Sequence, residues 1–192
     1  MKIETTEDKC YGIMLSGGLD SAILLYLLIK ENPLIKIQPF TIPKFDGSAL
    51  YADPIIKHFN NKFGLAIPAT IMVGDPTAHH RAQSITAVKD IFSKYPVDIL
   101  FNALNQNPPS LSDLPNAPNR VKKSDHPKMV LPFVDLYKDQ IVQFMIDNGQ
   151  EDLMVITHTC TEQTVGRCNK CWQCTERKWA FEQLDKEDIG VC

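Results

Sequence analysis

The sequence lacks a long apolar run, an excess of positive charge, and any repeat or low-complexity tract. No apolar stretch approaches the roughly 20 residues that a membrane-spanning helix needs. A net charge of −3 over 192 residues gives no general reason to expect a nucleic-acid partner. The first eight residues are polar and acidic, which predicts no signal peptide. These absences predict a cytoplasmic protein that binds neither membranes nor nucleic acids.

Cysteine is scarce outside one short region. Four of the six cysteines lie between Cys160 and Cys174. A small secreted chain with six cysteines would suggest disulfides, whereas this chain is long enough to bury a good core, and its clustered cysteines favour a metal site. We therefore expect an α/β domain over residues 1–150 and a four-cysteine zinc-binding segment with a helix over residues 151–192.

Strand-like and helix-like stretches alternate along the first 150 residues. Apolar stretches at 11–15, 35–42, 67–73, 97–103 and 129–133 predict strands, and helical spacing of apolar residues follows most of them. In the helix expected over 81–95, Ile85, Val88, Ile91 and Phe92 are predicted to face the core. This alternation predicts a Rossmann-type α/β fold, with a parallel sheet and helices on both faces.

The first strand meets the first helix at Ser16-Gly17-Gly18-Leu19-Asp20-Ser21. Glycines there let the backbone approach a phosphate, and the free N–H groups and dipole of the helix favour an anion. The spacing does not fit a Walker A loop, and no lysine follows the glycines. An ordinary tight turn is the alternative. The predicted phosphate site comprises Leu15, Ser16, Gly17, Gly18, Leu19, Asp20, Ser21 and Ala22, and Asp20 is a candidate ligand for the Mg²⁺ of a nucleotide.

The four clustered cysteines have the spacing Cys160-x7-Cys168-x2-Cys171-x2-Cys174. Four thiolates can complete a tetrahedral shell around Zn²⁺ and leave no open position, so the predicted zinc is structural. Such an ion would contribute directly to the stability of the C-terminal helix. An iron–sulfur cluster and redox-active thiols are the alternatives.

The segment Asn105–Lys128 interrupts the alternation. It is rich in Pro, Asn, Ser and Asp, which disfavour regular structure. A long loop of this kind is usually an active-site lid or a disordered connection, and we favour a lid.

Several motifs resemble those of 7-cyano-7-deazaguanine synthases, a family of N-type ATP pyrophosphatases. The loop at residues 16–21 resembles the PP-loop of these enzymes. Near the other end, Leu131-Pro132-Phe133, Leu136–Val142 and Thr157–Cys160 resemble family segments. Cys168, Cys171 and Cys174, followed by Arg177 and Phe181, fit the family's Cys-x-x-Cys-x-x-Cys-x-x-Arg ending.

This resemblance implies an adenine nucleotide α-hydrolase-like fold and an enzyme that uses ATP with Mg²⁺. The implied reaction joins 7-carboxy-7-deazaguanine to ammonia and yields 7-cyano-7-deazaguanine, through adenylation of the carboxylate. The resemblance also implies a homodimer. Asp20 and Lys138 are the candidate catalytic residues, with Lys138 stabilising phosphate charge. A solvated lysine on the first turn of a helix is the alternative for Lys138.

Four further residues are candidates for substrate binding: Lys44, Asn102, Asn105 and Arg177. The first three are expected on loops at the carboxyl edge of the sheet, where α/β proteins bind ligands. Arg177 contacts substrate or phosphate in one interpretation and supports the cysteine segment in the other. The chain departs from the family at 41–47 and 102–107, which leaves open a different acceptor or a catalytically silent ATP-binding module.

Overall fold

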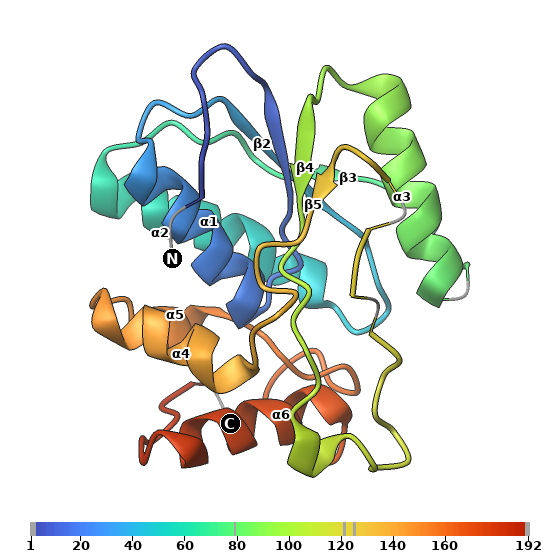
Figure 1. Ribbon diagram of the computed structural model, residues 1–192, viewed down its shortest axis with the longest axis vertical. Coiled ribbons are helices and arrows are strands. Elements are labelled where there is room, and N and C mark those ends of the chain that lie inside the picture. The colour runs from blue at the N-terminus through green and yellow to red at the C-terminus, as the bar shows by residue number, and fades with distance from the viewer. Residues whose placement is uncertain (1–2, 79, 121, 125, 191–192) are drawn as a thin grey trace.

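A computed structural model describes residues 3–78, 80–120, 122–124 and 126–190. Its centre is a parallel sheet with the strand order β3-β2-β1-β4-β5, in which each neighbouring pair is parallel (Figure 1). The strands of the described residues are β1 (Tyr11–Met14), β2 (Ile37–Thr41), β3 (Ile71–Met72), β4 (Ile99–Phe101) and β5 (Met129–Val130).

Six α-helices and two 3₁₀ turns accompany the sheet in the described residues. They are α1 (Leu19–Glu31), η1 (Ser48–Tyr51), α2 (Ala52–Phe63), α3 (His80–Lys94), η2 (Pro109–Leu111), α4 (Lys138–Asp147), α5 (Leu153–Ile156) and α6 (Trp172–Gln183). The expected alternation of strands and helices is confirmed, and the sheet is parallel because each crossover returns through a helix or a long connection.

Helices cover both faces of the sheet, as the sequence predicted. Alternate residues of the strands point to opposite faces. Ile13 and Phe101 join the core formed with α1 and α2, whereas Phe40 and Leu100 join the core formed with α3. Gly12 of the central strand lies where a β-carbon would be 2.9 Å from the Leu100 side chain, so glycine permits the close packing of this second core.

Two expectations about this region are wrong. The strand predicted over 67–73 is reduced to Ile71–Met72, and its ladder with β2 begins only at Phe40. Pro39 of β2 and Pro68 of the incoming chain have no N–H to donate, which fits this late start of the pairing. Ile85, predicted to face the core, is 63% exposed, whereas Ile91 is buried as predicted and Ala87, which was not predicted, is buried beside it.

The C-terminal elements pack on the α1 side of the sheet. Helix α4 contacts both α1 and α6, and α5 contacts α1 and α2 (Figure 1). Leu153, Met154, Ala180 and Phe181 belong to the same buried cluster as α1. Residues 151–190 therefore share a core with the α/β part of the chain. Within the described residues, none of the helices combines the length and apolar character needed to cross a membrane.

Candidate active site and metal centre

The loop between β1 and α1 has the geometry of an anion site. Gly17 has a φ of 81°, in the left-handed region that favours glycine, and Gly18 is the N-cap of α1. No side chain caps the helix, so N–H groups of its first turn remain available. The Ser21 hydroxyl donates to the Gly18 carbonyl at 3.0 Å and accepts from the Ser16 N–H at 3.2 Å, which holds the loop closed on itself.

Two distant segments hold this loop in place. The His158 N–H donates to the Gly17 carbonyl at 2.9 Å. The ring of Tyr51 stacks on that of His158, with centroids 4.6 Å apart. A β-carbon on Gly17 would lie 2.1 Å from the Ser48 carbonyl oxygen, so the close approach of η1 requires glycine here. The loop is therefore fixed from both sides before any ligand binds.

Asp20 and Lys138, the two predicted catalytic residues, form an ion pair. Lys138 Nζ lies 2.6 Å from Asp20 Oδ2, and the lysine side chain is 5% exposed. Lys138 is therefore not the solvated lysine of the alternative interpretation. The other carboxylate oxygen, Asp20 Oδ1, is buried and has no hydrogen-bond partner among the described residues. A buried carboxylate oxygen without a partner is suited to Mg²⁺, which proteins usually hold through one or two carboxylates plus phosphate oxygens.

A third charged residue, Glu176 of α6, lies next to this pair. Its Oε2 is 3.6 Å from Lys138 Nζ, and Arg120 donates to both of its oxygens, at 2.5 and 2.9 Å. The Asn105 amide donates to Oε1 at 3.2 Å. Burial raises the pKa of Glu176, but the nearby Lys138 and the hydrogen bond from Arg120 outweigh it, so the pKa lies below its usual value.

The sequence analysis missed both Glu176 and Arg120. Glu176 could have been found, because Trp172, Glu176 and Ala180 follow one another at intervals of four and so share a helix face. An acidic residue on a face that is otherwise buried requires a cationic partner. Arg120 lies in the proline-rich segment without any periodic pattern, and nothing local distinguishes it.

The four predicted substrate-binding residues lie in different surroundings. Lys44 is half-buried on the loop after β2, and Asn102 is half-buried directly after β4, so both leave the sheet at the carboxyl edge near the loop of residues 15–18. Asn105 is 3% exposed and donates to Glu176.

Arg177 makes its hydrogen bonds within the C-terminal segment. It donates to Asp188 at 2.8 and 3.0 Å, to Thr159 at 2.9 Å and to the Met154 carbonyl at 3.0 Å. Burial lowers its pKa, against the opposing effect of the hydrogen bond to Asp188. These contacts support the alternative in which Arg177 is a structural partner of the cysteine segment.

The four predicted metal ligands come together. The Sγ atoms of Cys160, Cys168, Cys171 and Cys174 all lie within 4.8 Å of one another. Backbone N–H groups point at two of the sulfurs: Glu162 and Cys168 donate to Cys160 Sγ at 3.4 Å, and Lys170 and Cys171 donate to Cys168 Sγ at 3.4 and 3.2 Å. Such bonds stabilise thiolates, and this donor set fits a tetrahedral metal ion.

The electrostatics of one thiol agree with this arrangement. Burial raises the pKa of Cys171, but hydrogen bonds involving Thr161 and Cys174 have the larger effect and lower the pKa to about 7. The thiolate is the form that binds metals, so this thiol needs little additional stabilisation to become a ligand. Cys171 is also the N-cap of α6, and Cys174 lies in its first turn.

The segment expected to form a lid lies against the cysteine segment. The Asn116 amide donates to the Lys170 carbonyl at 3.3 Å, and Arg120 donates to the Gln106 carbonyl at 3.0 Å as well as to Glu176. Of this segment, residues 121 and 125 lie outside the described residues. Asn105 and Arg120 of this segment donate to Glu176 and so hold the segment beside the charged residues of the site.

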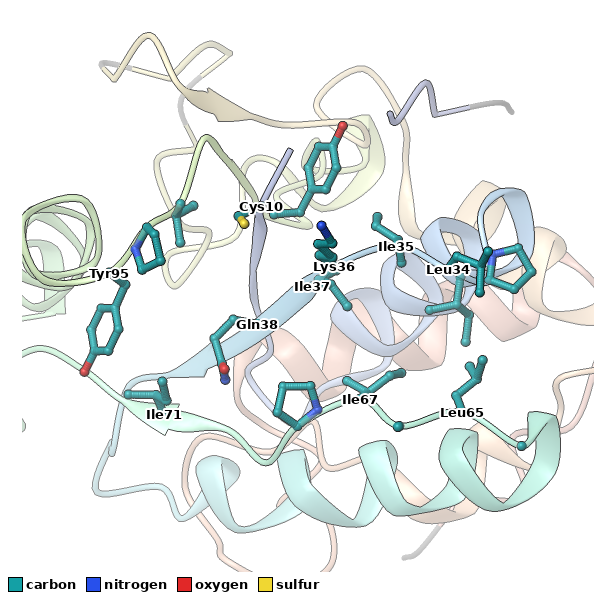
Figure 2. Close-up of a pocket in the computed structure, with 18 residues that line it drawn as sticks. Cys10, Leu34, Ile35, Lys36, Ile37, Gln38, Leu65, Ile67, Ile71 and Tyr95 are labelled. Carbon is teal, nitrogen blue, oxygen red and sulfur yellow. The ribbon is translucent and has the colours of Figure 1, made fainter. Parts of the chain in front are cut away.

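A pocket of about 610 Å³ lies at the opposite edge of the sheet (Figure 2). It is lined mainly by apolar side chains from the amino ends of β1 and β2, from the chain leading to β3 and from the connection before β4, among them Ile37, Ile67 and Tyr95. Parallel α/β sheets bind their ligands at the carboxyl edge, where the loop of residues 15–18 lies. We therefore place the candidate active site at the loop and not in this pocket.

Part of the chain matches a known protein family. A family model described as queuosine biosynthesis protein QueC matches residues 106–185, which include Lys138, Glu176 and all four clustered cysteines. The match covers less than half of the chain. None of the curated protein sequences compared with the chain matches it.

Two solved structures align with most of the chain. NMN synthetase from Francisella tularensis aligns with a TM-score of 0.52 at 15% identity, over 93% of this chain and 78% of the synthetase. The U34-tRNA thiolase NcsA from Methanococcus maripaludis, solved with its 4Fe-4S cluster, aligns with a TM-score of 0.48 at 16% identity, over 94% of this chain and 66% of the thiolase.

At this identity, the likeness to the synthetase establishes the fold alone. The QueC match adds the C-terminal part, with its lysine and its cysteines. The described geometry adds the loop at the carboxyl edge of the sheet. The chain thus shares its fold with the synthetase, and its residues 106–185 match the QueC family model.

Proposed function

We propose that the chain is an ATP-dependent ligase that converts 7-carboxy-7-deazaguanine and ammonia into 7-cyano-7-deazaguanine. The observation that carries the proposal is the Asp20–Lys138 ion pair beside the uncapped N-terminus of α1. It combines a lysine suited to phosphate charge, a carboxylate oxygen suited to Mg²⁺ and a row of backbone N–H donors. These are the groups that binding and transfer of a nucleotide phosphate require.

The first step of the proposed reaction activates the carboxylate. A carboxylate oxygen attacks the α-phosphorus of ATP, the bond from that phosphorus to the bridging oxygen breaks, and pyrophosphate leaves. Ammonia then attacks the acyl carbon, AMP leaves with the oxygen, and a proton is lost to give the amide. Adenylation is needed because oxide is a poor leaving group and the negative carboxylate repels a nucleophile.

The second step repeats the activation on the amide. Its oxygen attacks the α-phosphorus of a second ATP, and pyrophosphate leaves again. Loss of AMP and two protons from the adenylated amide forms the carbon–nitrogen triple bond. Two ATP are therefore consumed per nitrile, with two AMP and two pyrophosphates released. The protein's task in both steps is to align the reactants and to stabilise charge.

We assign roles in this scheme to the polar groups at the loop and on the neighbouring strand. The N–H groups from Gly17 to Ser21 hold the departing pyrophosphate, and Lys138 neutralises its charge. Mg²⁺ held by Asp20 Oδ1 would supply further charge neutralisation when bound. Thr41, 1% exposed at the end of β2, has a hydroxyl without a partner among the described residues, and we assign it to the nucleoside of ATP.

Lys44 and Asn102 are our candidates for the acceptor. Both lie on the loops that leave the carboxyl edge of the sheet. A lysine and an amide suit the carboxylate and the purine-like edge of 7-carboxy-7-deazaguanine. The loops at 41–47 and 102–107 are also where the chain departs from the family pattern, so a different acceptor would act through these same residues.

We further propose that the cysteine cluster holds Zn²⁺ and that residues 151–192 form a segment organised by this ion. The Cys₄ donor set and the N–H···S bonds support a closed tetrahedral site. An iron–sulfur cluster would use the same residues. The two are separated by metal analysis and absorbance: a zinc protein is colourless, whereas an iron–sulfur protein is brown.

The proposed function is tested by ATP–pyrophosphate exchange. Purified protein with Mg-ATP and radiolabelled pyrophosphate should form labelled ATP only when 7-carboxy-7-deazaguanine is added. With ammonium also present, mass spectrometry should detect 7-cyano-7-deazaguanine. If this acid supports neither exchange nor nitrile formation, the proposed acceptor is wrong. Exchange with another carboxylate would then show that the chain is a PP-loop enzyme with a different substrate.

A further inference from the structure

Glu176 is the most enclosed charged residue near the candidate site. It is 0% exposed, and its carboxylate accepts from Arg120 and Asn105 while lying 3.6 Å from Lys138 Nζ. A buried carboxylate is costly unless it is paired and hydrogen-bonded. Its described partners all come from outside α6: Asn105 and Arg120 from the segment after β4, and Lys138 from the start of α4. Glu176 therefore joins segments that the sequence keeps far apart.

The charges of this cluster balance. Asp20 and Glu176 supply two negative charges, and Lys138 and Arg120 supply two positive ones. Lys138 lies between the two carboxylates, 2.6 Å from Asp20 and 3.6 Å from Glu176. Its ammonium group is therefore pulled toward both the loop and α6. Without the charge on Glu176, only Asp20 would fix its position, and Asp20 also serves the nucleotide.

Glu176 is also tied to the metal centre through its helix. Cys171 is the N-cap of α6, and Cys174 lies two residues before Glu176 in the same helix. A metal bound to these cysteines would fix the first turn of α6. Fixing that turn also fixes the Cα of Glu176 relative to α4, because α4 and α6 pack against each other.

From these contacts we propose that Glu176 is a positioning residue: it sets the Lys138 ammonium group for ATP and so connects the cysteine segment to the nucleotide site. The proposal rests on the proposed function only in taking residues 15–22, the loop and the first turn of α1, as an ATP site. The identity of the acceptor does not enter. Arg120 and Asn105 hold the other side of the carboxylate and keep it from turning away from Lys138.

A double-mutant cycle tests the proposal. Glu176→Gln keeps the shape of the side chain and removes its charge, and Lys138→Met removes the ammonium group. The quantity measured is the Kd for Mg-ATP by titration calorimetry. We expect each single variant to weaken binding about tenfold, the loss associated with one charged hydrogen bond. We expect the double variant to be weakened about tenfold as well, because Glu176 acts through Lys138.

Independent effects give the opposite result. If the double variant loses about a hundredfold, the two effects are additive, Glu176 does not act through Lys138, and the proposal is overturned. Unchanged binding in Glu176→Gln overturns it too. Glu182→Gln is the matched control, since Glu182 lies on the same helix but is exposed and pairs with Lys178 at the surface. It should bind Mg-ATP like the wild type.

A second variant covers the case in which Glu176→Gln does not fold, which a thermal melt reports. Glu176→Asp keeps the charge one methylene further from Lys138, and the same cycle applies to it. The calorimetric result is also separable from the proposed function. If the two substitutions are coupled but no nitrile forms, the positioning role of Glu176 is supported and the proposed acceptor is wrong. If nitrile forms but the two effects are additive, the proposed acceptor is supported and the role of Glu176 is overturned. A wild type that binds no Mg-ATP overturns both.

Discussion

Lys138 Nζ lies 2.6 Å from Asp20 Oδ2, although 118 positions separate the two residues along the chain. Asp20 lies in the first turn of α1 and Lys138 begins α4, so the pair joins two helix N-termini. A phosphate placed there would meet N–H dipoles, an ammonium group and, through the carboxylate, a bound cation. The fold therefore brings together, at this pair, groups that suit a bound phosphate.

Replacing Asp20 by asparagine should impair catalysis more than folding. Asp20→Asn keeps the side-chain volume but removes the negative charge that holds Lys138 and that favours Mg²⁺. We expect substrate-dependent ATP–pyrophosphate exchange to fall by about a hundredfold, the usual cost of losing one such electrostatic contact. Asp90→Asn is the control, because Asp90 pairs with Lys94 on the surface of α3. Exchange retained in Asp20→Asn would remove Asp20 from the mechanism.

The parts of the site that are local in sequence could be predicted from it. The glycine loop and the cysteine cluster each lie within a short stretch, so residue type and spacing are enough to indicate an anion site and a metal site. The alternation of strands and helices was likewise sufficient for the parallel sheet with helices on both faces, which the structure confirms.

Contacts between distant residues could not be predicted in this way. The cluster of Glu176, Arg120 and Asn105 depends on how the segment after β4 lies against α6, and no periodic pattern encodes this. The short β3 and the exposed Ile85 have a related cause, since edge strands and outer helix faces depend on which neighbours are present. Propensity gives way to tertiary context at such positions.

Alanine at Gly17 should disrupt the loop, whereas alanine at Gly64 should be tolerated. Both glycines have positive φ, 81° and 65°, so alanine adds backbone strain of about 1–2 kcal/mol in each case. Only at Gly17 would the new β-carbon meet a backbone oxygen, at 2.1 Å, while the space around Gly64 is open.

We therefore expect Gly17→Ala to lower the free energy of unfolding by more than about 3 kcal/mol or to abolish Mg-ATP binding, and Gly64→Ala to cost about 1 kcal/mol with binding intact. Denaturant unfolding and calorimetry measure the two effects. Equal losses in both variants would mean that η1 does not press on the loop as the structure indicates.

Removing the metal should loosen the C-terminal helix. If one ion is bound by the four cysteines, its binding energy contributes to folding, since the ligands are brought together only in the folded chain. We expect one equivalent of metal per chain by mass spectrometry and, after chelation, a fall in Tm of at least about 10 °C. Cys174→Ser should behave like the chelated protein. Cys10→Ser, which changes a cysteine outside the cluster, should retain both metal and Tm.

The Asp188 carboxylate should stabilise the protein at neutral pH and lose this effect in acid. It accepts from Arg177 at 2.8 and 3.0 Å and lies 2.7 Å from Arg167. Burial raises its pKa, but the hydrogen bond from Arg177 and the charges of both arginines outweigh this, so the pKa is lowered in the folded state. A lowered pKa means that the charged form is favoured by folding.

The sign of the pH dependence follows from this shift. The stabilisation is fully present above the unfolded pKa of Asp, about 4, and disappears as the pH falls through the lower folded value. We expect Asp188→Asn to cost about 2 kcal/mol at pH 7, and the gap to the wild type to narrow as the pH falls below about 4. Urea unfolding at several pH values measures the gap, with Glu187→Gln as the exposed neighbouring control. A gap that stays constant from pH 7 to pH 3 would show that Arg177 is held by its other contacts, to Thr159 and the Met154 carbonyl, and not by the charge of Asp188.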